Sequence, residues 1–401
     1  MPSIYFKMKY IYLTLALAGL ALSCMRCGSD SESTVSEDRA TTITIDMDRS
    51  VEQMDCAFLF DTTRCEIIPL ETSDECLIGE VSKIFSENGR ICILDKKANS
   101  VFILEEDGRL TAKIFAVGRS DREYLELADM SVSGGLIWLL DQAMNKILCY
   151  DLSGQYLKTI DISSYWANKI LVRNDRIYLI NEWSDSNEGM YRLFVLDTDG
   201  KPIDKFLPFE TEDTDRYCGR DLESYTILGD EIDLCYPSDN TVYGVADGKC
   251  TAKYRIDFGK RTMPEEHAAK SLIEYMNNGL NEEYVMGIDA FKESSRYLFF
   301  RFGLGATDYT AIYDKKTGTV DLTNSASLIN NSTCCLSLTS YFVEGDDVYS
   351  YIPAYQLKLI YAYGTKNKLP EGNVYGDRLS QIIADTDESD NGILVKYKLN
   401  E

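Results

Sequence analysis

His267 is the only histidine in the chain, and this limits the chemistry that the protein can carry. Catalytic zinc sites usually take two or three imidazole ligands, and a Ser-His-Asp triad needs one imidazole as its base. The sequence also lacks the Gly-x-Ser-x-Gly elbow, the phosphate-binding P-loop and the Gly-x-Gly-x-x-Gly dinucleotide fingerprint. We therefore predict no metal site and no cofactor, and we interpret His267 as a residue on the surface of a helix.

Carboxylates are far more numerous, with 65 Asp and Glu residues in a chain of 401. A glycoside hydrolase needs two of them about 5–10 Å apart, a condition that the sequence neither locates nor excludes. Four acids lie close together in one segment: Asp213, Asp215, Asp221 and Glu223. We interpret this segment as a solvated acidic loop; calcium bound by its oxygens is the alternative, although the spacing matches no EF-hand. A carboxylate-dependent glycan hydrolase or lyase is thus kept as an alternative function.

Aromatic residues beside polar groups are the better candidates for ligand binding. Tyr124 follows Arg119 and Glu123 in one loop, and Trp166 and Trp183 lie in two later loops. Flat rings next to hydrogen-bonding groups suit sugars and peptides. These five residues are the predicted ligand-binding candidates. Packing of the two tryptophans between repeating units of the fold is the alternative interpretation.

The amino-terminal residues predict export and a lipid anchor. The first 23 residues contain no acid, and Lys7 and Lys9 precede an apolar run that is shorter than the ~20 residues needed to span a bilayer. The run ends in Leu-Ala-Leu-Ser-Cys at positions 20–24, which resembles a bacterial lipobox. We predict a lipoprotein signal peptide over 1–23, with diacylglycerol on the sulfur of Cys24. An ordinary secretory signal, with Cys24 incidental, is the alternative.

Charge restricts the partners of the mature chain. Residues 24–40 are polar and aperiodic, and they predict a flexible acidic tether. The chain has 41 Lys and Arg, and loss of Lys7 and Lys9 with the signal peptide would take its formal net charge from −24 to −26. An acidic surface repels nucleic acid and anionic membrane. We expect no nucleic-acid partner, and membrane association through the lipid anchor only.

Twelve cysteines in an exported chain raise the question of disulfide bonds. A bridge among Cys56, Cys65 and Cys76 is left open. Other cysteines fall inside apolar segments, where a free thiol packs as a small apolar side chain. Those in predicted strands are Cys92, Cys149 and Cys235.

Six short apolar segments, each preceded by a tight turn, predict the elements that hold these residues. They begin 46, 40, 55, 65 and 51 residues apart. The segments are 91–95, 137–141, 177–181, 232–236, 297–301 and 348–352. A recurrence at roughly 40–50 residues with several short strands per unit is typical of a propeller. We predict that residues 41–401 form an all-β, six-bladed β-propeller.

Five blades are predicted to be complete and the sixth to be split. The end of the chain supplies only three strands for that blade, at 338–343, 348–352 and 393–397. A spare strand at 65–70 precedes the first blade, and its pairing in the last blade would close the ring and hide the open sheet edges. Pro264 and Gly279 bound a helical insertion near 264–279, and a second short helix is expected at 377–384.

The turns divide the predicted ring into two faces. Turns between first and second strands and between third and fourth strands are short in every blade; we call their side the short-turn face. The opposite side, the long-loop face, carries every long segment: 116–126, 181–190, 207–223, 259–284, 302–308, 323–336 and 354–390. Loops on a rigid scaffold are the usual place for binding sites, so we expect function on the long-loop face. Simple plugging of the channel mouth by these loops is the alternative.

The chain resembles the six-bladed β-propeller lipoproteins of Bacteroidetes, whose fold is NHL-like. The segments that carry the resemblance are 65–72 (Cys-Glu-Ile-Ile-Pro-Leu-Glu-Thr), 77–84, 93–102 and 118–124. The last often reads Gly-Arg-Gly-Pro-Gly-Glu-Tyr in that family, whereas here it reads Gly-Arg-Ser-Asp-Arg-Glu-Tyr. A turn that depended on the central Gly-Pro-Gly must therefore be built differently.

The resemblance implies a place on the bacterial outer membrane, on its periplasmic or its cell-surface side. It implies no activity, because the family has no established one. We therefore expect a binding or interaction module for a peptide, a protein or a glycan, acting through the long-loop face of the propeller.

Overall fold

The fold is described from a computed structural model of the chain. It describes residues 40–211, 225–236, 239–264, 267, 272–325, 328–329, 342–359 and 376–400. All of these fall in one unit of the chain, Thr34–Glu401. Cys24, the predicted tether up to residue 39 and the four clustered acids at 213–223 lie outside the described residues.

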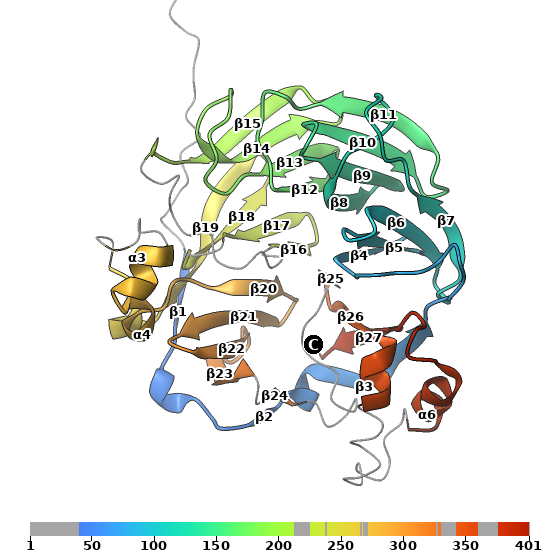
Figure 1. The fold of residues 1–401 in the computed structure, drawn as a ribbon. Coiled ribbons are helices and arrows are strands. Elements are labelled where there is room, and N and C mark those ends of the chain that lie inside the picture. Colours follow the sequence, from blue (N-terminus) through green and yellow to red (C-terminus); the bar gives the residue numbers. More distant parts are fainter. Residues whose placement is uncertain are drawn as a thin grey trace, which may run out of the picture. The chain divides into compact units, whose positions relative to one another are not determined.

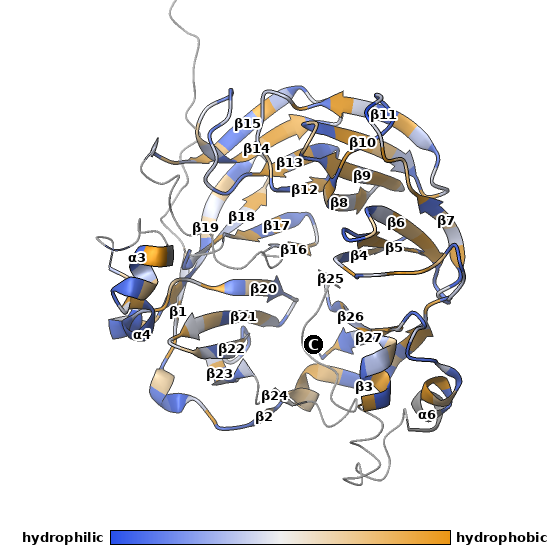
Figure 2. Ribbon diagram, in the orientation of Figure 1, coloured by the Kyte–Doolittle hydropathy of each residue, from blue (hydrophilic) through white to orange (hydrophobic). Residues whose placement is uncertain are grey.

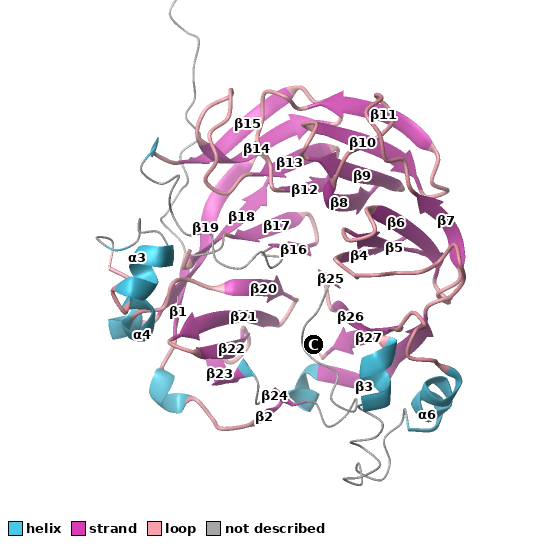
Figure 3. Cartoon of the chain, in the orientation of Figure 1, coloured by secondary structure: helices cyan, strands magenta, loops and turns pink. Residues whose placement is uncertain are grey.

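Four-stranded antiparallel blades follow one another around a ring, which confirms the predicted six-bladed propeller (Figures 1 and 3). Four blades are separate sheets, and a parallel pairing of Ile227 with Glu344 joins the other two, blades 4 and 6, into one sheet. Blade 1 is β4 (Lys83–Glu87), β5 (Arg90–Asp95), β6 (Ser100–Glu105) and β7 (Leu110–Ile114). Blade 2 is β8 (Leu127–Ser133), β9 (Leu136–Asp141), β10 (Lys146–Asp151) and β11 (Tyr156–Asp161). Blade 3 is β12 (Lys169–Arg173), β13 (Arg176–Ile180), β14 (Tyr191–Asp197) and β15 (Pro202–Pro208).

The other three blades complete the ring, and the last is built from both ends of the described chain. Blade 4 is β16 (Tyr225–Leu228), β17 (Glu231–Cys235), β18 (Thr241–Ala246) and β19 (Lys249–Asp257). Blade 5 is β20 (Asp289–Glu293), β21 (Tyr297–Leu304), β22 (Thr307–Asp314) and β23 (Thr319–Asn324). Blade 6 is β25 (Phe342–Glu344), β26 (Asp347–Ile352), β27 (Ile393–Leu399) and β3 (Phe60–Pro69).

The predicted ring closure is confirmed by the pairing of β3 with β27. The two strands are antiparallel, with Ile67 opposite Val395 and Cys65 opposite Tyr397. Strand β3 begins five residues before the predicted strand because Phe60 also pairs, across a bulge, with Leu399. No disulfide bond joins Cys56, Cys65 and Cys76 to one another in this arrangement.

A feature that the sequence did not lead us to expect is a belt of residues 41–55 on the outside of blades 4 and 5. Strand β1 (Thr41–Thr44) pairs in parallel with β19 and makes a fifth strand of blade 4. Val51 then bridges Thr323 of blade 5, and β2 (Met54–Asp55) pairs with β24 (Leu328–Ile329). Figure 1 shows this belt in blue between β1 and β3.

Buried apolar side chains from neighbouring blades pack face to face and hold the ring together. In Figure 2 apolar residues (orange) concentrate in the strands, while most connecting loops are hydrophilic. Residues alternate along each strand between the two neighbours: Ile137 and Leu139 belong to the cluster shared with blade 1, whereas Trp138 and Leu140 pack toward blade 3. Trp138 is 2% exposed and lies in the core.

A buried polar side chain ends the second strand in each of the first three blades. Asp95 accepts hydrogen bonds from the backbone N–H of Gly79, in the connection that enters the blade, and of Ala98, in the following loop. Asp141 does the same with Leu125 and Met144. Asn181 bonds to both backbone groups of Ser184. The polar residues that end the apolar segments thus fix the base of the long-loop face.

The predicted helical insertion is present, and its described part consists of two short helices. Helix α3 (Leu272–Asn277) is followed at Gly279, which has a φ of +66°, by α4 (Leu280–Glu283). Tyr275 is buried, whereas Ile273 and Met276 are exposed. Helix α6 (Gly376–Asp385) lies where the second short helix was expected. None of the described helices is both long enough and apolar enough to cross a membrane.

Candidate functional site

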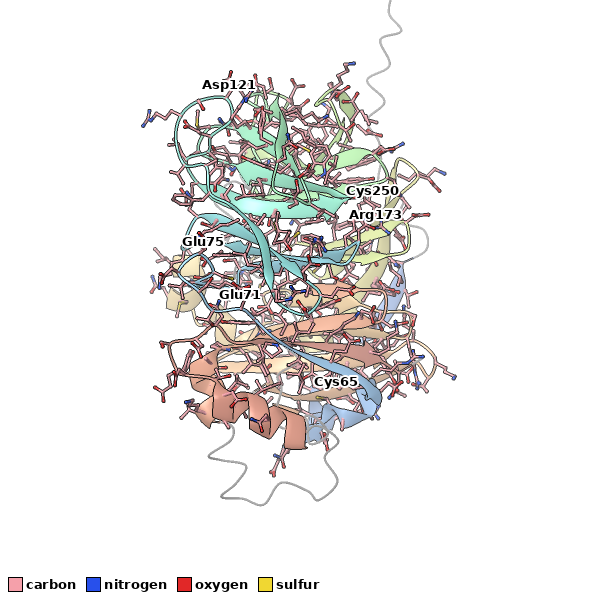
Figure 4. All side chains as sticks on the ribbon, turned by 90° about the vertical axis from the view of Figure 1, so that its right-hand side faces the viewer. Cys65, Glu71, Glu75, Asp121, Arg173 and Cys250 are labelled. Atoms are coloured by element: carbon pink, nitrogen blue, oxygen red, sulfur yellow. The ribbon has the colours of Figure 1, made fainter. Side chains whose placement is uncertain are left out.

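The two faces of the propeller are separated as the turn lengths predict. In the edge-on view of Figure 4, Asp121, in the connection between blades 1 and 2, lies on one side of the ring. Arg173, beside the first turn of blade 3, lies on the other side. The Asp121 side is the long-loop face, where the predicted ligand-binding residues are expected to lie.

Tyr124 and Glu123 are built into the turn of their own loop. The backbone of Tyr124 exchanges hydrogen bonds with Gly118 and Ala116, and its hydroxyl donates to the carbonyl of Asn99 at 2.9 Å. The ring is fully buried. The carboxylate of Glu123 accepts from the backbone N–H of Ser120 at 2.9 Å, and this bond lowers its pKa. These contacts form the turn with Ser-Asp-Arg at positions 120–122 in place of a Gly-Pro-Gly.

The remaining predicted residues are spread over the same face. Arg119 is exposed in the loop of Glu123 and Tyr124. Trp166, in the connection between blades 2 and 3, is 36% exposed, and Trp183, in a loop of blade 3, is 8% exposed. Among the five, only Trp183 contacts a charged group that is buried with it. Contact of the others with a ligand stays a prediction.

Trp183 covers one face of a buried arginine, Arg192, whose other face lies against Tyr236. The guanidinium carbon is 4.0 Å from the ring centre of Trp183 and 3.7 Å from that of Tyr236. Two rings cannot share one side of the guanidinium at these distances, so they enclose it from both sides. Nη1 lies 3.2 Å from a carboxylate oxygen of Asp239. We call Trp183, Arg192, Tyr236 and Asp239 the Arg192 clamp.

Neighbouring strand ends of blades 3 and 4 position the clamp. Arg192 is the second residue of β14, and its carbonyl accepts from the N–H of Asn181 and from the hydroxyl of Tyr236, at 2.8 and 2.7 Å. Tyr236 directly follows β17, and burial raises its pKa well above the usual range. Asp239 is held by the N–H of Thr241 at 2.9 Å and by the hydroxyl of Tyr243 at 3.3 Å. All these groups lie at the long-loop ends of their strands.

Two nitrogens of the clamp have no acceptor among the described residues. Arg192 is 6% exposed, and its Nε and Nη2 are buried without a hydrogen bond. A buried donor without a partner costs about 1–3 kcal/mol, and more when it is charged. A water or an acceptor group of a ligand is therefore expected beside these two nitrogens.

A small cavity adjoins the clamp through Tyr236. Its volume is about 20 Å³, which is room for a single water. The side chains that line it come from blades 3 and 4: Lys169, Ile180, Glu182, Tyr225, Leu234, Cys235 and Tyr236.

A buried acid pair, Asp233 and Glu293, forms a second charged cluster between blades 4 and 5. Their exposures are 0% and 1%. Lys253 contacts both carboxylates, at 2.9 and 3.2 Å, and Lys315 contacts Glu293 at 2.8 Å. Glu231 pairs with Lys253 at 2.7 Å. The cluster lies under the short turns, because Asp233 follows the first turn of blade 4 and Glu293 precedes that of blade 5.

The pKa values of the two acids shift in opposite directions. Burial raises the pKa of Asp233 to about 9, and the hydrogen bond to Glu293 and the charge of Glu293 add to the rise. The pKa of Glu293 is lowered: burial opposes this, but the hydrogen bond from Asp233 and the two lysines outweigh it. Asp233 is therefore the donor and Glu293 the ionised acceptor.

This pair is poorly arranged for glycoside hydrolysis. The two catalytic carboxyls of a glycosidase lie about 5–10 Å apart on either side of the scissile bond. Here both acids are sealed from solvent, and Glu293 accepts a hydrogen bond from the hydroxyl of Tyr254 at 2.9 Å. The cluster can hold a proton, but no substrate fits between its acids.

A larger hollow, of about 370 Å³, lies on the short-turn face between blades 2 and 3. Trp138 and Lys158 are at its wall, with Arg173 and Asp175 from the first turn of blade 3. The indole nitrogen of Trp138 is buried without a hydrogen bond. Among the described residues no three His, Cys, Asp or Glu side chains are placed to hold a metal ion.

Arg192, Asp239 and the acid pair are not among the residues predicted from the sequence. Asp233 interrupts a segment that is otherwise apolar, and Arg192 follows the first residue of an apolar strand. A charged residue inside such a strand is seldom buried without a partner. That signal could have marked both residues, although it would not have named their partners.

Comparisons with known proteins agree on the fold. The family model described as "Domain of unknown function (DUF4934)" matches residues 42–398. A protein of Bacteroides fragilis NCTC 9343 that is taken to be exported has a solved structure with a TM-score of 0.70 and 19% identity. The match covers 90% of this chain and 100% of that one. At this identity the likeness shows a shared fold alone.

Two other solved structures are less similar. A member of the duf4221 family from Bacteroides vulgatus ATCC 8482 has a TM-score of 0.45 and 9% identity, over 84% of this chain and 96% of its own. Virginiamycin B lyase from Staphylococcus aureus has a TM-score of 0.36 and 13% identity, over 65% and 73%. Likeness at this level supports no functional argument. No curated protein matches the chain.

Proposed function

The chain belongs to the DUF4934 family, and we propose that it serves at the bacterial cell envelope as a binding module. In this proposal a lipid on Cys24 anchors the propeller, and its long-loop face binds a peptide, a protein or a glycan.

The Arg192 clamp is the observation that carries the proposal. It places a buried cation, two aromatic rings and two unused hydrogen-bond donors on the face that bears the long loops. Recognition sites are typically apolar or aromatic surfaces with a few polar groups in fixed positions. The exposed ring of Trp166 on the same face adds apolar contact area.

Binding is favoured over glycan cleavage because of the acid pair. Asp233 and Glu293 are a pair of buried acids, and they lie away from the long loops and closed to solvent. A cleaving enzyme would need accessible acids on either side of a substrate.

The envelope location rests on the amino-terminal residues, which lie outside the described structure, and on the similar Bacteroides fragilis protein that is taken to be exported. Cys24 is proposed to carry the lipid, on the outer membrane and on its periplasmic or cell-surface side.

Ligand binding is tested by screening the purified full chain against immobilised peptides and glycans. Trp166→Ala and Trp183→Ala should each weaken any interaction found, by roughly tenfold for a well-packed aromatic contact. Leu157→Ala is the control, because Leu157 is exposed near the opposite face. A ligand whose affinity is unchanged by both tryptophan substitutions would place binding elsewhere. Turnover of a glycan that one carboxylate substitution abolishes would replace the binding proposal with an enzymatic one.

The anchor is tested by fractionating cells that express cysteine variants. Cys24→Ala should move the protein from the membrane to the soluble fraction, because the acidic chain has no other means of membrane attachment in this proposal. Cys27→Ala is the matched control and should stay with the membrane. Membrane association that survives Cys24→Ala would contradict the anchor.

A further inference from the structure

We infer that the long-loop face recognises a carboxylate, which Nε and Nη2 of Arg192 bind through two parallel hydrogen bonds. The inference rests on the proposed binding function and names the chemical group that anchors the ligand.

The unused nitrogens are the pair that a bidentate contact needs. Nε–H and one N–H of Nη2 point the same way along one edge of the guanidinium group. A planar carboxylate accepts from this edge with both oxygens, and this fork geometry is why arginine is preferred for such contacts. Nη1 lies toward the other edge, where it is used by Asp239.

Asp239 cannot supply the missing acceptors in its observed position. Its carboxylate contacts Arg192 through Nη1 only, at 3.2 Å. The N–H of Thr241 and the hydroxyl of Tyr243 bond to the two Asp239 oxygens. An arginine with a purely structural role would be expected to turn its fork toward its partner acid. Here the partner acid is fixed to one side, and the fork is left free.

The two aromatic rings favour a flat ligand group. Trp183 and Tyr236 lie about one ring thickness above and below the guanidinium, at 4.0 and 3.7 Å. An acceptor that continues the plane of the guanidinium enters the same slot. A carboxylate is planar and fits between the rings, whereas a tetrahedral phosphate or sulfate is thicker than the slot.

Charge favours a single negative charge over two. Asp239 already offsets the charge of Arg192, and the chain as a whole has a formal net charge of −24. A dianion would add excess negative charge to a site of low solvent exposure, where charge is expensive. One carboxylate adds the least charge that still satisfies both donors.

Access to the fork requires the loop of Trp183 to move. Both nitrogens are closed to solvent, and the cavity beside Tyr236 has room for only about one water. Residues 181–190, which carry Trp183, contain neither helix nor strand. Displacement of the Trp183 ring should therefore accompany binding, and its fluorescence should report it.

The test is a titration of the purified full chain, followed by tryptophan fluorescence and calorimetry. The probes are paired so that only the carboxylate differs: an N-acetylated tripeptide of alanine with a free carboxyl terminus against its terminal amide, and glucuronic acid against glucose. Binding of the carboxylate members alone is expected, and the stronger of the two shows whether the group comes from a peptide or from a sugar. Equal response to both members of each pair would overturn the inference.

Variants locate the binding at Arg192. Arg192→Lys keeps the charge but loses the fork, and should raise the Kd of the responding probe on the order of tenfold. Arg296→Lys is the matched control, because Arg296 also packs on a tyrosine ring and pairs with an aspartate, but near the short-turn face. A Kd that Arg192→Lys leaves unchanged would show that the fork binds water only, and would overturn the inference.

Asp239→Asn gives a result of opposite sign and does not depend on the folding of an Arg192 variant. It removes the competing anion while keeping the fork, so the probe should bind roughly threefold to tenfold more tightly. Unchanged or weaker binding would count against the inference. The binding proposal itself has a separate outcome: a ligand that Trp183→Ala weakens, but that carries no carboxylate, would refute the inference and leave the proposed function standing.

Discussion

At the scale of single residues, the proton held by Asp233 balances the charges of its cluster. With Asp233 neutral, Glu231 and Glu293 face Lys253 and Lys315, so two negative charges meet two positive ones. Ionised Asp233 would add an unmatched charge inside the propeller. The raised pKa of Asp233 keeps this residue neutral and so maintains the charge balance of the buried cluster.

Asp233 should make the protein less stable as the pH rises from about 4 to 9. Its pKa is 3.8 in the ordinary state and about 9 in the fold, so over this window the folded chain keeps a proton that the unfolded chain has lost. The free energy of unfolding then falls by up to about 1.4 kcal/mol per pH unit for one proton. Asp233→Asn, whose amide can still donate to Glu293, should flatten this decline. Urea unfolding of both proteins at about pH 5.5 and 8.5 measures it.

Glu293→Gln is the contrasting variant. Glu293 is the ionised member, and its loss leaves Lys253 and Lys315 without their shared counter-charge. Breaking a buried ion pair from one side costs about 3–5 kcal/mol, so this variant should be destabilised at both pH values. If Asp233→Asn lowered the free energy of unfolding as much as Glu293→Gln, this would contradict the assignment of the proton to Asp233.

The predicted residues show what a sequence can say about single side chains. Tyr124 was predicted as a ligand-binding residue because it lies near Arg119 and Glu123 in the sequence. Its ring is instead buried, and its hydroxyl donates to the backbone of Asn99. Trp183 was selected as a ring in a long loop, and its partner Arg192 follows nine residues later on another element. Partners across a loop or a blade depend on tertiary structure, which the local pattern does not contain.

At the scale of elements, the outer belt should stabilise the edge of blade 4. Ile43 of β1 is 2% exposed and belongs to the apolar cluster of blades 4 and 5. Ile43→Ala should lower the free energy of unfolding by about 2 kcal/mol, near the low end for a buried isoleucine because β1 lies at the periphery. It should also speed hydrogen exchange in β19, whose edge β1 covers. Mass-resolved exchange over residues 249–257 measures the second effect.

Val51→Ala is the control within the same belt, because Val51 is 47% exposed. Its unfolding free energy should stay within about 0.5 kcal/mol of the unsubstituted protein. Exchange in β19 that is equally slow in both variants would show that the belt does not protect this edge.

Strands and turns were predictable from the sequence wherever a short local pattern specifies them. The turn at Asn88 and Gly89 adopts φ values of +51° and +73°, as a tight hairpin requires, and the apolar segments became the second strands. Closure by β3 could be inferred because a blade lacked a strand. Strand β1 escaped notice because Ile43 and Ile45 offer too short an alternation, and its partner lies some 210 residues away.

At the scale of the whole molecule, negative charge shapes how an anionic ligand arrives. The chain carries a formal net charge of −24, and its described acids are distributed over all six blades. A carboxylate that approaches the clamp must cross this repulsive field before it reaches Arg192. The long-range repulsion and the short-range attraction respond differently to salt, because screening weakens interactions through solvent more than buried ones.

The association rate of a carboxylate probe should therefore rise with ionic strength. Between about 10 mM and 150 mM salt the Debye length shrinks from about 30 to 8 Å, which removes most of the repulsion outside the clamp. The dissociation rate should change little, since the buried contact with Arg192 is screened weakly. Stopped-flow fluorescence of tryptophan measures both rates. A neutral ligand found in the peptide and glycan screen is the control, and its association rate should show no salt dependence. A rate that falls with salt would mean that the field around the clamp is locally positive and steers the carboxylate inward, contrary to the net charge.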